Sequence, residues 1–176
     1  MTSSYGNKPT QALSDESQKT VQAFESLDTD AKLAWFYLAY KKMGDTITPA
    51  APAAAEPELA PILLGDYYEL SDDQQLAIMR QIVNREDSDY SRAYGALKEN
   101  NQLMVWFAWA QGMGNSVVGM PENYQATEAI NNLLSQIEEL DFEAQMSMFR
   151  TIVSNMGYSD VKPIETQAQT GKTTSL

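Results

Sequence analysis

The 176-residue chain contains no cysteine and no histidine. It therefore cannot form disulfides, thiolate nucleophiles, His-dependent triads, thiolate zinc sites or imidazole-ligated haem. The Glu-x-x-His pairs that hold metal in di-iron bundles are excluded for the same reason. Because these absences remove most of the common catalytic arrangements, we expect a protein that is not an enzyme and that binds no metal.

Positive charge is also scarce. The chain has 12 Lys and Arg against 24 Asp and Glu, a net charge of -12, which argues against binding to nucleic acid or to an anionic bilayer surface. No apolar run reaches the roughly 18 residues of a membrane-spanning helix. The polar start MTSSYGNKPTQ lacks the basic region and apolar core of a signal peptide. We expect a cytoplasmic protein that is not an integral membrane protein.

Helix signals recur along the chain, and no segment shows the period-two alternation of a strand. The pattern predicts an all-α fold, with a helical domain at residues 14–160 between a flexible arm at 1–13 and a polar tail at 161–176. Ser14 is the expected N-cap of the first helix, and Ser71 begins a capping box.

Glycines and prolines predict where several helices end. The second helix is expected to start at Asp28 or Asp30 and to stop at Gly44, which suits the left-handed position after a helix. The proline-rich residues 47–61 begin as a loop, with a helix expected within 58–70. Later helices are predicted at 89–97, 101–113, 125–139 and 142–156. The helix at 101–113 is expected to end at Gly114, and the helix at 142–156 at Gly157.

A shift of 70 residues aligns the chain with itself without gaps. The identical pairs include Leu33/Leu103, Met43/Met113, Gly44/Gly114, Gln75/Gln145, Arg80/Arg150, Ile82/Ile152 and Val83/Val153. Amphipathic helices share Leu, Ile and Val by chance, but the Met-Gly pairs and the arginines stay in register across a proline-rich loop. We therefore predict an internal duplication, with two similar halves packed about a pseudo-two-fold axis.

Aromatic rings and methionines are concentrated in a few segments. The stretch AWFYLAYKKMG has four rings in six residues, and the shift places its WFYLAYKKMG on VWFAWAQGMG. Such stripes are commonly plain core, but rings on more than one helix face, together with nine adaptable methionines, favour an elongated ligand channel at the seam between the halves. The set is Trp35, Phe36, Tyr37, Tyr40, Met43, Met79, Trp106, Phe107, Trp109, Met113, Met120, Met146 and Met148.

Charged residues on the predicted helices allow two interpretations. Arg80 and Arg150 each lie between apolar positions of a predicted helix. The first interpretation is structural, with the side chain reaching solvent or forming an ion pair with a neighbouring helix. The second is functional, with the arginine docking a ligand or a partner at the edge of a pocket or interface. Acidic pairs such as Asp72/Asp73 lie at helix starts or on solvent faces, where capping and solubility explain them better than acid-base catalysis does.

Five segments carry a family resemblance. LAWFYLAYKKMGDTITPAAPAAA, NREDSDYSRAYGAL, VWFAWAQGMG, MPENYQ and MFRTIVSNMGY together resemble the N-terminal helical domain of the orange carotenoid protein. The resemblance implies two interleaved helical bundles enclosing a keto-carotenoid, with canthaxanthin, echinenone or 3'-hydroxyechinenone as candidates. It also implies quenching of singlet oxygen and, in some members, of phycobilisome excitation. Because the family's C-terminal domain is missing, the chain resembles a stand-alone helical carotenoid protein, without light switching of its own.

The resemblance also implies a set of site residues. Tyr37 stands where photoactive members have Trp, Ala110 where they have Gly, and Arg150 on an arginine used for interdomain pairing and phycobilisome docking. A separate C-terminal-domain homologue is a further candidate partner. The expected site is Leu33, Phe36, Tyr37, Tyr40, Met43, Met79, Leu103, Trp106, Phe107, Ala110, Met113, Met120, Tyr124, Met146 and Arg150.

Two other functions stay open at this point. The chain could be an acidic all-α adaptor whose rings are only core and whose surface meets a basic partner. It could also be an enzyme that uses Asp, Glu, Tyr or Lys on a lipid, although no convergent set of such residues is visible in the sequence. Colour after co-expression with a keto-carotenoid pathway would separate a carotenoid protein from an adaptor.

Overall fold

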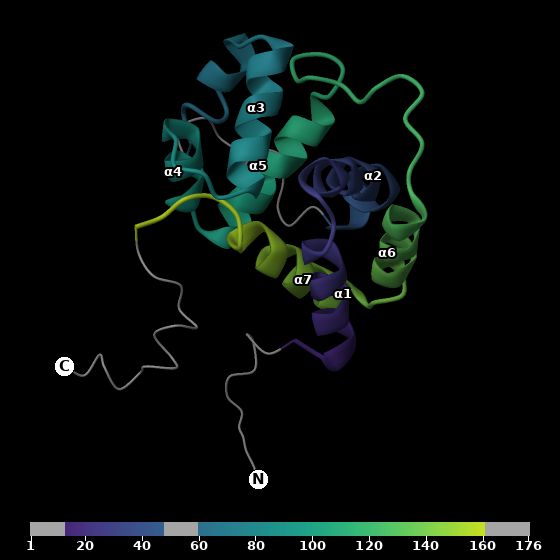
Figure 1. Cartoon of the computed structure of the whole chain (residues 1–176). Coiled ribbons are helices and arrows are strands. Elements are labelled where there is room, and N and C mark those ends of the chain that lie inside the picture. The colour runs from purple at the N-terminus through teal and green to yellow at the C-terminus, as the bar shows by residue number, and fades with distance from the viewer. Residues whose placement is uncertain (1–12, 48–59, 161–176) are drawn as a thin grey trace, which may run out of the picture.

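The computed structural model describes residues 13–47 and 60–160, which form seven α-helices, one short 3₁₀ helix and no strand (Figure 1). This all-α fold confirms the predicted class. The expected arm and tail lie outside the described residues, apart from Leu13. In chain order the elements are α1 (Asp15–Glu25), α2 (Thr29–Ile47), the 3₁₀ helix η4 (Asp66–Glu69), α3 (Asp72–Val83), α4 (Asp89–Gly95), α5 (Glu99–Gln111), α6 (Glu128–Glu138) and α7 (Phe142–Ser154).

Side-chain caps begin several of the helices at the predicted residues. Ser14 accepts a hydrogen bond from the backbone N–H three residues further on, at 3.1 Å, and Asp28 does the same for α2 at 2.8 Å. Ser71 and Gln74 make both hydrogen bonds of a capping box. These caps satisfy N–H groups that the first turn of a helix leaves unpaired, which is why the helix starts could be read from the sequence.

Two predicted boundaries are wrong. α2 does not stop at Gly44 but continues to Ile47, because a glycine inside a helix costs only about 1 kcal/mol. Of the helix expected within 58–70, the described residues 60–70 form only η4, since the chain folds back tightly at Gly65, where a Cβ would lie 2.6 Å from the Pro61 carbonyl oxygen.

Gly114 and Gly157 were expected to end their helices, but α5 already ends at Gln111 and α7 at Ser154. Gly114 and Gly157 both have φ of +84°, the left-handed conformation that glycine adopts without steric cost. Each lies three residues beyond the last residue of its helix.

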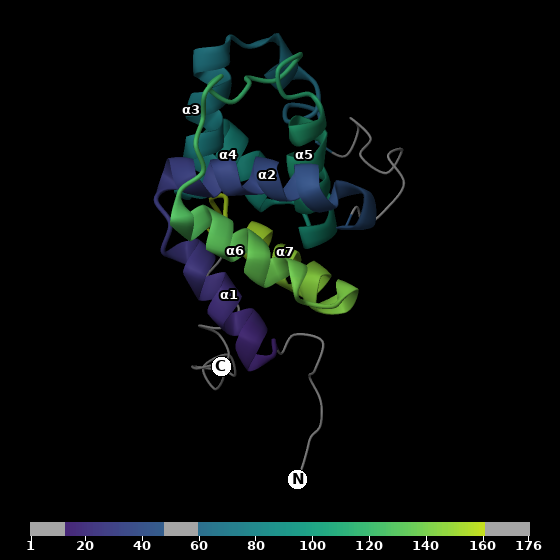
Figure 2. The same ribbon diagram turned by 90° about the vertical axis from the view of Figure 1, so that its right-hand side faces the viewer.

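The helices form two groups, with α2 between them (Figure 2). One group contains α3, α4 and α5, and the other contains α1, α6 and α7. α1 from the start of the chain packs on α6 and α7 from its end, while α3 packs on α4. Each group thus combines helices from both halves of the sequence, as the prediction of two interleaved bundles requires.

Several side-chain contacts recur 70 residues apart. Arg80 on α3 pairs with Asp30 on α2 (Nε to Oδ1, 2.9 Å), and Arg150 on α7 donates to Asn100 on α5 at the same distance. The buried Gln75 donates to the carbonyl oxygen eight residues before it, at 3.0 Å, and Gln145 does so at 2.9 Å. This recurrence supports the proposed repeat, because shared apolar periodicity alone would not reproduce polar contacts in register.

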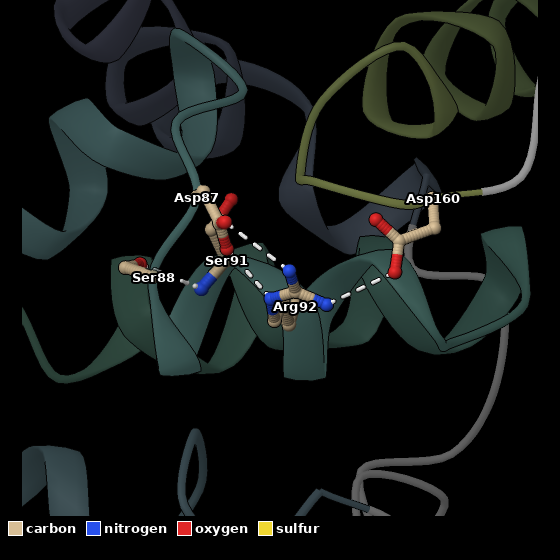
Figure 3. A network of polar contacts seen from close by, with 5 residues as sticks. All are labelled: Asp87, Ser88, Ser91, Arg92 and Asp160. Carbon is tan, nitrogen blue, oxygen red and sulfur yellow. Dashed lines mark hydrogen bonds and ion pairs between the residues drawn. The ribbon is translucent and has the colours of Figure 1, made fainter.

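Arg92 on α4 holds the residues that follow α7 (Figure 3). Its guanidinium lies between Asp87 (Nε to Oδ1, 2.6 Å) and Asp160 (Nη1 to Oδ2, 3.2 Å), and it stacks on the Tyr158 ring at 4.7 Å. The Tyr158 N–H donates to the carbonyl oxygen of Ser91 at 3.1 Å. The hydrogen bond from Arg92 holds the pKa of the Asp87 carboxyl below its usual range.

None of the described helices combines the length and the apolar character that a bilayer-spanning helix needs.

Candidate ligand site

The contact between α2 and α5, which we call the seam, is rich in aromatic side chains. The residues that share one face of α2 are Leu33, Phe36, Tyr37 and Tyr40, and those that share the matching face of α5 are Leu103, Trp106, Phe107 and Ala110, each set at the i, i+3, i+4, i+7 spacing. The rings of Phe36 and Trp106 are stacked, with centroids 5.1 Å apart and planes within 3°. Because the repeat aligns these two residues, their stack lies at the centre of the seam.

A small hollow of about 30 Å³ lies on one side of this stack. It is apolar, and side chains from α2, α3 and α5, together with Met113 just after α5, surround it. Seven of its eight lining residues belong to the set expected from the sequence, and Trp109 is the eighth. The lining is Leu33, Phe36, Tyr37, Met79, Trp106, Trp109, Ala110 and Met113.

On the other side of the stack the Tyr40 ring packs on Phe107, with centroids 5.8 Å apart, and the Met43 sulfur lies 3.9 Å from the side-chain amide nitrogen of Gln145. The repeat aligns Tyr40 with Ala110, so a ring stands on this side where a methyl group stands beside the hollow. The two equivalent positions therefore differ in side-chain size.

Hydrogen bonds fix the two tryptophans that line the hollow. Trp106 Nε1 donates to the Tyr94 hydroxyl at 2.9 Å, and that hydroxyl donates to the carbonyl oxygen of Val153 on α7 at 2.7 Å. Trp109 Nε1 donates to the carbonyl oxygen of Leu63 at 3.0 Å. Complete burial raises the pKa of Tyr94 well above its usual value, so the hydroxyl stays protonated and available as a donor.

The remaining expected residues do not line the hollow. Leu103, Phe107 and Met146 are buried, and Met120 is half-buried against the core. Tyr124 is 36% exposed in the segment between α5 and α6. Arg150 lies on α7, with its guanidinium directed to Asn100. The structure therefore brings seven of the expected residues together around the hollow, and Tyr124 and Arg150 are not among its lining residues.

A family model described as the orange carotenoid protein, N-terminal, matches residues 10–159. The chain belongs to this family. Among its curated relatives in the orange carotenoid protein family is an orange carotenoid-binding domain-containing protein of Nostoc sp. (strain PCC 7120), 34% identical over 81% of this chain and 84% of the relative. The orange carotenoid-binding protein of Synechocystis sp. (strain PCC 6803) is 30% identical over 89% of this chain, which spans only half of that longer relative.

Solved structures of the family share the fold. The red carotenoid protein of Anabaena (Nostoc) sp. PCC 7120, in a structure binding canthaxanthin, is 36% identical and covers 81% of this chain and 99% of its own, with a TM-score of 0.71. A second structure of that protein binds a mixture of carotenoids. The orange carotenoid protein of the same organism, binding canthaxanthin, has a TM-score of 0.75 at 28% identity, and this chain covers 51% of it.

The lining of the hollow suits a carotenoid in chemistry but not yet in volume. Rings, methionines and leucine offer an apolar polyene faces and edges to pack against. Pockets for ordinary small ligands, however, measure roughly 300 to 1,000 Å³, about tenfold more than this hollow. A long ligand therefore requires the side chains of the seam to move.

Two residues of the site were not part of the expected set. Trp109 follows Trp106 by three positions and belonged to the ring-rich stripe, but no single pattern distinguished a lining ring from a core ring. Tyr94 aligns with Phe24 under the repeat, so the extra hydroxyl was visible in the sequence. Its partners, Trp106 and the Val153 carbonyl, could only be found in three dimensions.

Proposed function

We propose that this chain binds a keto-carotenoid, canthaxanthin foremost, in the seam between α2 and α5. The observation that supports this most directly is the apolar hollow beside the Phe36–Trp106 stack, in a family whose solved members bind canthaxanthin or mixed carotenoids. Echinenone and 3'-hydroxyechinenone are alternative ligands of the same class. The pseudo-two-fold arrangement of the seam suits an elongated molecule with two similar ends.

Apolar burial supplies the affinity in this proposal. If about 400 Å² of polyene surface leaves water, the gross stabilisation at ~25 cal/mol per Å² is on the order of 10 kcal/mol, before the costs of binding. The seam offers rings on both sides, each adding roughly 0.5 to 1.5 kcal/mol where it meets a conjugated system edge-on or offset. Few polar contacts are needed.

The proposed role is photoprotection rather than catalysis. A bound polyene supplies low-lying excited states that accept energy from singlet oxygen and release it as heat. The protein keeps the ligand in water-free surroundings through Leu33, Met79 and Met113, and holds its conformation with Trp106 and Trp109. No proton transfer or covalent step is required, which agrees with a chain that lacks His and Cys.

Docking to a phycobilisome is a further part of the proposal, with Arg150 as the contact. Arg80 is neutralised by Asp30, whereas the equivalent Arg150 donates to the neutral amide of Asn100. Within the described residues no carboxylate forms an ion pair with Arg150. Its positive charge is therefore available to an anionic surface. We also propose a cytoplasmic location, and exchange of pigment with a separate C-terminal-domain homologue.

Co-expression with a keto-carotenoid pathway tests the central claim. We expect a purified orange or red protein with a polyene absorption spectrum, which shortens the lifetime of singlet oxygen in solution. The variants Tyr40→Ala and Trp106→Ala should bind less pigment while keeping their helical circular dichroism. A colourless wild-type protein would instead favour an acidic adaptor, and full pigment binding by both folded variants would place the ligand elsewhere.

A further inference from the structure

Each half of the chain supports its seam ring with a second ring. Phe24 meets Phe36 edge-on, with centroids 5.5 Å apart and planes at 75°. Tyr94 meets Trp106 in the same way, at 6.2 Å and 70°. The repeat aligns Phe24 with Tyr94 and Phe36 with Trp106, so the two pairs are equivalent supports on opposite sides of the central stack.

Only one of these supports includes hydrogen bonds. Trp106 is connected through the Tyr94 hydroxyl to the Val153 carbonyl oxygen, and both Tyr94 and Val153 are fully buried. Turning Trp106 away would leave an indole N–H and a hydroxyl without partners in the core, which is costly because water cannot replace them there. Phe36 and Phe24 have no polar atoms in their side chains, so Phe36 can turn without breaking any hydrogen bond.

The stack also separates the two equivalent positions of the seam. The hollow is bounded by Phe36 and Trp106, and the position related to it by the repeat, beside Tyr40 and Phe107, lies on the other side of the same rings. A rod-shaped ligand long enough to reach both positions cannot pass while the rings remain 5.1 Å apart and parallel. One of the two rings has to move.

We propose that Trp106 is the fixed wall and Phe36 the movable wall of the seam, and that Tyr94 is the positioning residue that holds Trp106 in place. Entry of a carotenoid turns Phe36 aside and joins the hollow to the Tyr40 side. The inference rests on the proposed carotenoid function for its ligand, but the role of Tyr94 is a property of the ligand-free chain and can be measured without pigment.

The first experiment uses the ligand-free protein labelled with nitrogen-15, in which three indole N–H signals report the three tryptophans. Tyr94→Phe removes the acceptor of the Trp106 N–H, and we expect its hydrogen exchange to accelerate at least about tenfold. Tyr67→Phe is the matched control, because Tyr67 is also buried and donates to a backbone carbonyl but accepts no indole N–H. Unchanged exchange at Trp106 in Tyr94→Phe would overturn the positioning role.

The second experiment measures the rate of pigment uptake by the ligand-free protein from carotenoid-loaded liposomes. We expect Phe36→Ala to take up pigment about tenfold faster, because no ring has to be cleared, and Leu38→Ala on the same helix to match the wild type. In Tyr94→Phe the bound pigment should show a shifted or broadened spectrum, whereas Tyr67→Phe should not.

The outcomes separate the two proposals. No uptake by any variant, with the exchange result intact, would refute the carotenoid function and leave the anchoring of Trp106 standing. Uptake by the wild type at the same rate as Phe36→Ala would refute the movable wall and leave the carotenoid function standing. If Tyr94→Phe fails to fold, Trp106→Phe, which removes the indole N–H and keeps a ring, replaces it and should give the same spectral change.

Discussion

The substitution Ala110→Tyr tests the proposed site most directly, because it gives position 110 the tyrosine that its repeat equivalent, Tyr40, already has. Ala110 borders the hollow of about 30 Å³, which is smaller than a phenol ring. The new ring therefore fills the hollow and presses on its neighbours. Overpacking of this kind costs about 1 to 3 kcal/mol, so we expect thermal unfolding a few degrees lower than in the wild type.

The effect on binding should be much larger than the effect on stability. If each side of the stack contributes about 200 Å² of buried ligand surface, closing one side removes roughly 5 kcal/mol at ~25 cal/mol per Å². A loss of that size corresponds to an affinity reduced by more than about a thousandfold. We expect Ala110→Tyr to be purified without pigment under conditions that give a coloured wild-type protein.

The assay compares the pigment absorbance per mole of protein after co-expression, with helicity checked by circular dichroism. Ala108→Tyr is the matched control, because Ala108 is half-buried on the same helix but does not line the hollow. It should lose stability without losing pigment. If folded Ala110→Tyr carried as much pigment as Ala108→Tyr, the ligand would not use the hollow and the reasoning would be refuted.

Three other predictions concern stability. Gly114 and Gly157 share the left-handed φ of +84°, but an added Cβ would contact other atoms only at Gly157. Urea unfolding should therefore show a stability loss of about 1 kcal/mol for Gly114→Ala and a clearly larger loss for Gly157→Ala. Equal losses would contradict the packing around Gly157. Gln75→Ala leaves the Ser116 carbonyl oxygen and the Val118 N–H without their side-chain partner, and hydrogen exchange of residues 113–118 should accelerate, an effect that Gln145→Ala should not reproduce. Because Arg92 lowers the pKa of Asp87 in the folded protein, the ion pair contributes fully to folding stability above the usual aspartate pKa, and this contribution is lost as the pH falls below that value. Asp87→Asn should therefore reduce the fall in stability at acid pH. An unchanged acid dependence would count against the pairing.

Local signals account for the parts of the fold that the sequence predicted well. The helix starts at Ser14, Asp28 and Ser71 follow from side chains that bond N–H groups only three residues away. A boundary was wrong at Gly44, where a weak local penalty was outweighed by continuation of the helix. Local chemistry thus predicts where a helix can begin more securely than where it will end.

The sequence by itself determined the all-α class and the kinds of side chain at the seam, because apolar periodicity and helix caps are visible in one dimension. Only the tertiary structure shows the hollow beside the Phe36–Trp106 stack and the hydrogen bonds that hold Trp106. The hollow is lined by Ala110, whose repeat equivalent is Tyr40, and the anchor depends on a Tyr94 hydroxyl that reaches the carbonyl of Val153, 59 residues away. Contacts of that kind depend on how the helices are brought together, and no local pattern in the sequence encodes them.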